Sequence, residues 1–178
     1  MRALMLLLIL AAFNLQAALP GDSVYQLDSH WQNRHDKQMN LQQLAGKKQI
    51  VALIYTDCIT ACPVIVSELK SIQAALSPEQ QQGLGFVLVS LTPARDTPKI
   101  MRHFATKRGL DEHWTLLSGS DERVRTLAMA LNIRYMGLAD GEIAHSNAIT
   151  VLDERGRVQF QQTGLPGGPE ALIDKLGL

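Results

Sequence analysis

The chain has 178 residues, of which 46% are hydrophobic and 5% aromatic, and this length and composition suit one globular domain with a sizeable core. Its 17 basic and 17 acidic residues cancel to a formal net charge of zero. No basic run is interleaved with aromatic residues, so the charge pattern excludes nucleic acid as an expected partner.

The first residues have the pattern of an export signal. Arg2 is followed by an apolar stretch to Phe13 that is too short to span a bilayer comfortably, and the small residues Ala17 and Ala18 come next. This pattern predicts a signal peptide over residues 1–18, a mature domain over residues 19–178, and export to a bacterial periplasm. An uncleaved segment that anchors the domain is the alternative. We expect membrane contact only through such a segment or through a partner.

The rest of the chain divides into short regular segments. Residues 19–48 are polar and irregular, with an expected edge strand over Val24–Leu27 and a helical turn over Leu41–Leu44. From Gln49 onward, hydrophobic periodicity and capping signals predict a strand over 49–55, a helix over 63–76, a buried strand over 84–91, a helix over 98–108, a strand over 114–117, a helix ending near 131, two strands over 148–152 and 157–161, and a short helix after Pro169.

This order of elements predicts the fold class. Strands alternate with helices through the middle of the chain, and a strand pair joined by a short turn comes near the end. Parallel strands connected by right-handed crossovers, with an antiparallel hairpin added at the C-terminal side, give a thioredoxin-like α/β fold with a mixed central sheet.

The only two cysteines, Cys58 and Cys62, directly follow the apolar strand that ends at Tyr55. Pro63 suits the first position of a helix, so we place Cys62 at the N-cap and expect residues 58–62 to form a loop folded over the helix start. A thiol at a helix N-terminus is near the positive end of the helix dipole, which favours the thiolate. Two such sulfurs suit either a disulfide or a soft metal ion, and the spacing leaves both open.

Two structural roles for these cysteines are disfavoured. A disulfide that closes so short a loop removes little entropy from the unfolded chain, so a purely stabilising bridge gains least here. A closed structural zinc site needs four ligands, and the chain has only two cysteines. A reactive or metal-binding role is therefore favoured.

Among the histidines, His145 is the best placed for a site. It precedes the strand over 148–152, and ligands of open α/β sheets sit beyond the carboxyl ends of strands, where the cysteines also lie. The other histidines lack a partner at ligand spacing and are expected to be exposed: His30, His35, His103 and His113. Met136 suits a soft metal ion chemically, but a loop or core role is favoured. Arg95 and Asp96 are expected to form the loop and cap of the next helix.

The segment Tyr55–Pro63 resembles the F-Y-T-x-C-x-x-x-C-P signature of the Sco/SenC family, the copper chaperones for cytochrome c oxidase assembly. Ser90–Pro98 is similar to the family's S-V-D-P-x-R-D-T-P segment, and Ala144–Ser146 to its D-H-[ST] segment. Asp153–Arg157 resembles its D-x-x-G-[RK] hairpin turn. The chain departs from these motifs at Thr92 and Ala144, where the family has acidic residues.

The resemblance implies a site and a function. The family's copper-binding thiols fall on Cys58 and Cys62, and its copper-binding histidine falls on His145. The implied cargo is copper, as Cu(I) or Cu(II), and the implied partner is a copper-accepting oxidase subunit or another copper carrier. We expect the protein itself to be a monomer. A thiol-disulfide oxidoreductase acting on cysteines of an oxidase subunit or other exported protein is the alternative. We also expect Cys58 and Cys62 to form a reversible disulfide in the metal-free protein.

Overall fold

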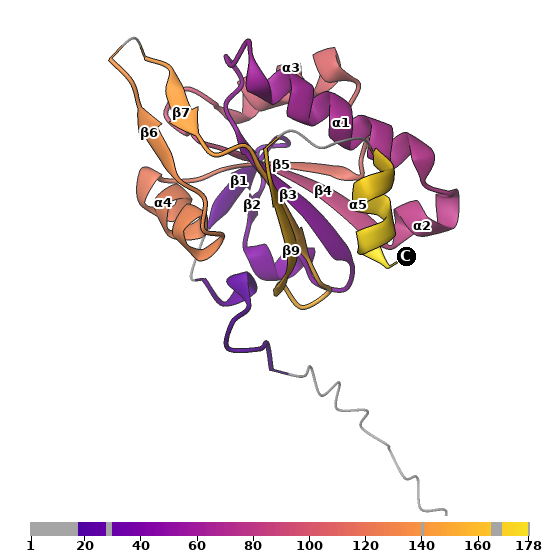
Figure 1. The fold of residues 1–178 in the computed structure, drawn as a ribbon. Helices are drawn as coiled ribbons and strands as arrows, with labels where there is room; N and C mark the ends of the chain where they lie inside the picture. Colours follow the sequence, from indigo (N-terminus) through magenta and orange to yellow (C-terminus); the bar gives the residue numbers. More distant parts are fainter. Residues whose placement is uncertain (1–17, 28–29, 140, 165–168, 178) are drawn as a thin grey trace, which may run out of the picture.

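The computed structural model describes residues 18–27, 30–139, 141–164 and 169–177 (Figure 1). The predicted signal peptide therefore lies outside the described residues, apart from its last residue, Ala18. Within the described ranges, no helix is both long and apolar enough to cross a membrane.

The described elements follow the predicted order and add several short ones. In chain order they are η1 (Val24–Gln26), β1 (Trp31–Asn33), β2 (Gln38–Met39), η2 (Leu41–Leu44), β3 (Lys48–Ile54), α1 (Ala61–Ala75), α2 (Pro78–Gln82), β4 (Leu84–Ser90), α3 (Pro98–Arg108), β5 (Trp114–Ser118), α4 (Asp121–Ala130), β6 (Tyr135–Gly137), β7 (Ile143–His145), β8 (Ala148–Leu152), β9 (Val158–Thr163) and α5 (Pro169–Leu176).

A seven-stranded sheet of order β2-β1-β5-β4-β3-β8-β9 forms the centre of the fold, and β6 and β7 form a separate two-stranded sheet. The strands β3, β4 and β5 are parallel, with Ile50 opposite Phe86 and Val87 opposite Thr115. The strand β8 runs antiparallel to β3 and forms the C-terminal hairpin with β9. The predicted mixed α/β architecture is confirmed.

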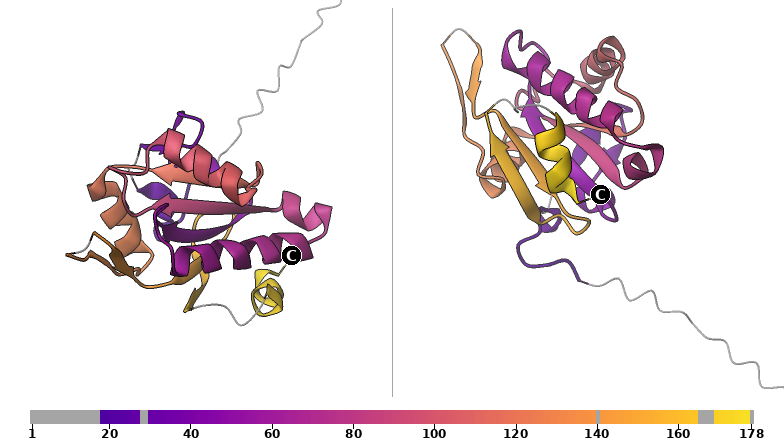
Figure 2. Two further views of the ribbon diagram at one scale, coloured as in Figure 1. Left: turned by 90° about the horizontal axis from the view of Figure 1, so that it is seen from above. Right: turned by 45° about the vertical axis from the view of Figure 1, so that its right-hand side comes forward.

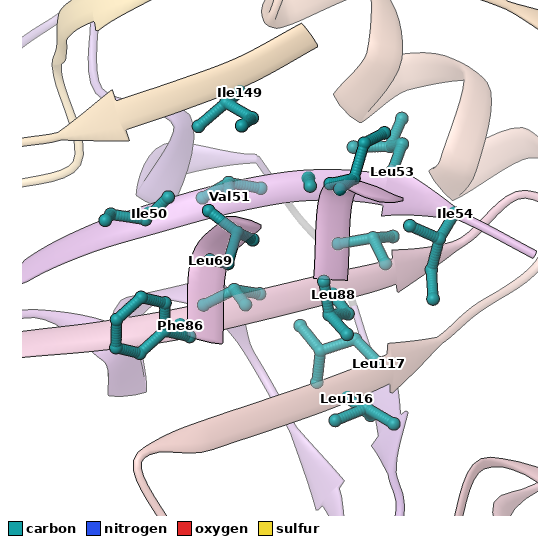
Figure 3. Close-up of a cluster of buried hydrophobic side chains, with 14 of the residues drawn as sticks. Ile50, Val51, Leu53, Ile54, Leu69, Phe86, Leu88, Leu116, Leu117 and Ile149 are labelled. Atoms are coloured by element: carbon teal, nitrogen blue, oxygen red, sulfur yellow. The ribbon is translucent and has the colours of Figure 1, made fainter. Parts of the chain in front are cut away.

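The core lies on both sides of β3 and β4. Every residue of β4, and every residue of β3 after Lys48, is buried, as expected for apolar runs in strands that are covered on both faces. Leu69 of α1 lies among side chains of these strands (Figure 3). The helices α1 and α5 pack against each other (Figure 2). The cysteine loop therefore leaves a strand that is held on both faces.

Three local predictions are corrected. Residues 24–26 form a 3₁₀ helix rather than a strand, because the Ser23 side chain accepts a hydrogen bond from the Tyr25 N–H and caps the turn. The helix predicted over 63–76 ends at Ala75, and a second, short helix follows it, α2, which the Ser77 side chain caps. The strands β1, β2, β6 and β7 have two or three residues each, which is too short for hydrophobic alternation to reveal them.

The N-terminal part of the described chain is fixed at the end of the sheet opposite the cysteines. The Val24 N–H donates to the Gly156 carbonyl, and the Ser23 hydroxyl donates to the Arg155 carbonyl. Both acceptors belong to the β8–β9 turn. Since β8 is antiparallel to β3, this turn lies at the amino end of β3, whereas the cysteine loop follows its carboxyl end.

Candidate metal centre

Cys58 caps the N-terminus of α1 with its sulfur. The N-cap residue Thr60 has φ −108° and ψ −85° and makes no side-chain capping bond. Instead, the backbone N–H of Cys62 points at the Cys58 Sγ, with 3.4 Å between nitrogen and sulfur. Cys58 is held in turn by its own N–H, which donates to the Tyr55 carbonyl at 3.2 Å. One thiol of the pair thus occupies the place of a capping oxygen.

This arrangement corrects the predicted role of Cys62. The helix begins at Ala61 rather than Pro63, so Cys62 lies in the first turn instead of at the N-cap. Pro63 is still tolerated, because its missing N–H would have no helical partner in the first turn. The Cys62 side chain is 1% exposed. The capping position therefore belongs to Cys58, and Cys62 faces the interior.

The two thiols differ in acidity for this reason. Burial opposes ionisation of Cys58, but hydrogen bonds to its sulfur from the Cys62 backbone and thiol and from the Thr60 N–H, with a further contribution from the Tyr55 hydroxyl, outweigh it and lower the pKa of Cys58 to about 7. Burial raises the pKa of Cys62 well above its ordinary value, and the neighbouring Cys58 adds to the effect. Both cysteines are free thiols here. Cys58 is the thiol that ionises first.

His145 reaches the cysteines from a different part of the fold. It ends β7 rather than lying in a loop, and it is half-buried. Its Nε2 is 3.8 Å from the Cys62 Sγ, and its Nδ1 is 3.4 Å from the Ser146 carbonyl oxygen. Burial lowers the pKa of His145. A neutral ring with its proton on Nδ1 donates to that carbonyl and leaves the Nε2 lone pair facing Cys62, as a metal ligand requires.

The three predicted residues are adjacent but do not yet surround a common point. Among the described residues, no group of three or more His, Cys, Asp or Glu side chains has the geometry to hold a metal ion. The Cys62 N–H donates to the Cys58 sulfur, so the two cysteines are held together at the start of α1. His145 belongs to the separate β6–β7 sheet. A closed three-ligand site therefore requires side chains from these two parts of the domain to rearrange.

Tyr55 connects the cysteine loop with the β6–β7 hairpin. Its ring is 3% exposed and meets the His145 ring edge-on, with 6.2 Å between centroids. Its hydroxyl donates to the Glu142 Oε2 at 2.6 Å. Burial raises the pKa of Tyr55, and the hydrogen bond to Glu142 adds to this rise, so the hydroxyl keeps its proton and remains a donor. Sequence reasoning missed Glu142, because nothing in the local sequence relates it to a tyrosine 87 residues away.

Asp96 holds together the strand ends beneath the site. It is 1% exposed, and its carboxylate accepts hydrogen bonds from the Ser90 hydroxyl at 2.6 Å and the Thr92 hydroxyl at 3.0 Å. The backbone N–H and hydroxyl of Thr56 also donate to it. The expected capping role is wrong, because Thr97 caps α3. Thr92 replaces an acidic residue of the family motif, and its hydroxyl supplies a donor to a buried carboxylate.

The remaining candidates lie outside the site. His30, His35 and His103 are exposed as predicted, while His113 is only half-exposed and lies 3.3 Å from Asp111. Met136 is neither in a loop nor in the core: it is on β6 and 64% exposed. It pairs with Ala144, whereas His145 pairs with Tyr135, so Met136 and His145 point to opposite faces of the hairpin.

Comparison with known proteins places the chain in a family. A SCO1/SenC family model matches residues 22–176. A SCO1 protein homologue of Bacillus subtilis is 24% identical over 143 residues, which are 78% of this chain and 74% of that protein. A SCO1/SenC family lipoprotein from Bacillus anthracis has a TM-score of 0.75 at 23% identity, covering 83% of this chain and 90% of that chain. For Bradyrhizobium japonicum ScoI, solved with copper bound, the TM-score is 0.70 at 22% identity, with 84% and 95% covered.

The family match and the geometry concern the same residues. The matched range contains the cysteine segment, the Ser90–Pro98 segment and His145. Hydrogen bonds join the first two through Asp96, and the Cys62 sulfur faces the His145 ring. The solved relatives, which share less than a quarter of their residues with this chain, agree with it in fold. The chain belongs to the SCO1/SenC family.

Proposed function

We propose that this protein is an exported copper chaperone that holds copper on Cys58, Cys62 and His145 and delivers it to the binuclear copper site of a terminal oxidase. The observation that carries the proposal is the approach of the His145 Nε2 to 3.8 Å from the Cys62 Sγ, across a sequence separation of 83 residues. Dithiol exchange needs no third ligand in that place, whereas a soft metal ion gains from one.

The acid–base properties of the three residues suit copper as cargo. Thiolate sulfurs prefer Cu(I), and an imidazole nitrogen extends the donor set toward Cu(II). Cys58 offers a thiolate near neutral pH, because its pKa is lowered to about 7. His145 offers a neutral ring, because burial lowers its pKa. Cys62 has to release its proton when a metal binds, so we expect copper uptake to release protons. The copper bound in the solved ScoI relative supports this choice of cargo.

The replacement His145→Ala tests the proposal. A chaperone that uses the imidazole loses its copper-thiolate absorption and much of its Cu(II) retention, while Cys58 and Cys62 still cycle with a small-molecule dithiol. His113→Ala, far from the thiols beside Asp111, is the matched control and should bind copper like the unaltered protein. Retention of copper by the His145 variant would mean that the third ligand is misassigned.

Export and the recipient are part of the same proposal. The N-terminal pattern of one basic residue, a short apolar stretch and two alanines supports a cleaved signal and a periplasmic protein. The described chain begins at the end of the domain opposite the cysteines, so an uncleaved anchor would leave the site accessible to a partner. Mass spectrometry of the exported protein distinguishes a chain that starts near Ala18 or Leu19 from one that keeps Met1.

A thiol-disulfide oxidoreductase is the second candidate, and the unequal acidity of the thiols favours it. In such a reaction the Cys58 thiolate attacks a target disulfide and forms a mixed disulfide, releasing one target thiolate. Cys62 then loses its proton and attacks the Cys58 sulfur, which forms the Cys58–Cys62 disulfide and releases the second target thiolate. The target gains the two electrons that the cysteines lose.

The pH dependence of alkylation tests whether Cys58 has this reactivity. Since only the thiolate reacts, the rate of modification of Cys58 by iodoacetamide should rise with pH and reach half its maximum near pH 7. Cys62 should stay unmodified over the same range, because burial raises its pKa. Peptide mass spectrometry of quenched samples assigns each adduct. Equal rates at the two cysteines would remove the distinction on which this second function depends.

A further inference from the structure

The β6–β7 hairpin carries His145 but has little core of its own. It forms a two-stranded sheet apart from the main sheet, and two views show it projecting beyond the rest of the domain (Figures 1 and 2). Met136 and Leu138, on its β6 side, are 64% and 43% exposed. Isolated two-stranded hairpins are marginally stable in water. Contacts with the main domain therefore determine where this hairpin, and with it the imidazole, lies, and they include Tyr135 and Ile143, which are partly buried against the core.

Two contacts fix the turn end of the hairpin to the body of the domain. The Tyr55 hydroxyl, at the end of the buried strand β3, donates to the Glu142 carboxylate at 2.6 Å. The Arg95 Nη2 donates to the Gly141 carbonyl at 3.2 Å. The arginine is 47% exposed, whereas Tyr55 is 3% exposed. Each bond has one charged partner, and the tyrosine bond is the stronger of the two because it is shorter and its donor is buried, although Glu142 itself is exposed.

We propose that Tyr55 and Glu142 form a latch that holds the β6–β7 hairpin where His145 faces the cysteines, so that Glu142 is a positioning residue for copper. The inference rests on the proposed copper-binding function. Glu142 contacts the tyrosine that the His145 ring meets edge-on, and it is three residues from His145. With the latch closed, the imidazole stays within reach of the sulfurs. With the latch open, two thiols remain on the main domain without their third ligand.

Glu142 is a cleaner site for mutation than Tyr55. The Tyr55 hydroxyl also helps to lower the pKa of Cys58, so Tyr55→Phe changes the thiol directly. Glu142→Ala removes the acceptor and leaves all three proposed ligands in place. Glu142→Gln removes the charge but keeps an oxygen that accepts from the hydroxyl, and it serves as the rescue variant. Met136→Ala, on the face of the same hairpin opposite His145, is the matched control.

The experiment follows copper on the full chain and each variant. Transfer of Cu(I) to a chromogenic Cu(I) chelator gives the dissociation rate, and electron paramagnetic resonance of the Cu(II) form reports nitrogen coupling from imidazole. For Glu142→Ala we expect dissociation to be about tenfold faster, the usual effect of losing one hydrogen bond to a charged group, together with loss of nitrogen coupling. Glu142→Gln and Met136→Ala should stay within about twofold of the unaltered protein. In a Tyr55→Phe background, Glu142→Ala should have no further effect.

Each outcome decides the inference. Copper retention by Glu142→Ala equal to that of the unaltered protein would overturn the latch, and so would a Glu142→Gln variant that loses copper as fast as Glu142→Ala. A separate measurement on the metal-free chain uses NMR contacts between the Tyr55 and His145 rings, which Glu142→Ala should weaken and Glu142→Gln should preserve. If the unaltered protein binds no copper, the proposed function fails, and these ring contacts still decide whether the latch exists.

Discussion

The two regions that meet at the site differ in how they are held. The cysteines follow β3, a strand that is paired on both edges and buried from Gln49 to Ile54. His145 ends β7, in a two-stranded hairpin whose residue Met136 is 64% exposed. One half of the site thus comes from the centre of the domain and the other half from an attached arm.

This difference shows how the protein can combine a fixed thiol pair with a movable third group. Local opening costs least where few apolar contacts are buried. The hairpin can therefore move away from the cysteines while the main sheet stays folded. A carrier that has to release its cargo gains from such a division, because the imidazole can leave before the sulfurs do. The following predictions test the division, starting with the largest expected effect.

Hydrogen exchange should separate the two regions most clearly. Amides of Val51 and Leu53 in β3 should exchange only when the whole domain opens, whereas amides of Met136 and Ala144 should exchange through local opening of the hairpin. We expect protection factors that differ by about a thousandfold. NMR-detected exchange of the metal-free protein provides them. Similar protection in both regions would mean that the hairpin belongs to the same cooperative unit as the sheet.

Substitutions of apolar side chains should show the same contrast in stability. Leu69 of α1 is fully buried against the main sheet (Figure 3), so Leu69→Ala should lower the free energy of unfolding by about 2–5 kcal/mol through lost burial and a cavity. Met136→Ala in the hairpin should change it by less than about 0.5 kcal/mol. Urea unfolding followed by circular dichroism measures both. A large cost for Met136→Ala would contradict the exposed position of that side chain.

Two glycines at positive φ allow the regions to be compared with one kind of substitution. Gly156, in the β8–β9 turn, has φ 80°, and an added Cβ would lie 2.5 Å from the Tyr25 ring. Gly141, in the hairpin, has φ 86° and no atom within 4 Å of an added Cβ. Gly156→Ala should lower the free energy of unfolding by about 3 kcal/mol, because it adds backbone strain and overpacking. Gly141→Ala should lower the free energy of unfolding by about 1 kcal/mol, because it adds backbone strain alone, and this strain lies in the hairpin.

Thermal unfolding of the two glycine variants checks this prediction. Gly156→Ala should lower the unfolding midpoint of the whole domain, because the β8–β9 turn belongs to the main sheet. Gly141→Ala should lower that midpoint by only about 2–4 °C and should also speed hydrogen exchange in the hairpin. Equal losses of global stability would show that the turn of the hairpin contributes as much to folding as the turn of the main sheet.

The sequence by itself determined the parts of the fold that depend on neighbouring residues. Apolar runs marked β3 and β4, Gly109 marked the end of α3, and the alternation of strands and helices indicated the parallel sheet. The Cys58–Cys62 pair after β3 was visible for the same reason. These signals depend on a few neighbouring residues, so they can be recognised in the sequence. Strands of two or three residues carry too little pattern, and β1, β2, β6 and β7 were not predicted.

The tertiary structure alone decided how these parts act together. The helix start, two residues earlier than Pro63 suggests, assigns the capping role and the lowered pKa to Cys58 rather than Cys62. Contacts between Cys62 and His145 and between Tyr55 and Glu142 span 83 and 87 residues. Such pairs depend on the order of strands in the sheet and on where a separate hairpin lies against it. Local propensity contains no information on either, because both are set by packing between elements far apart in the chain.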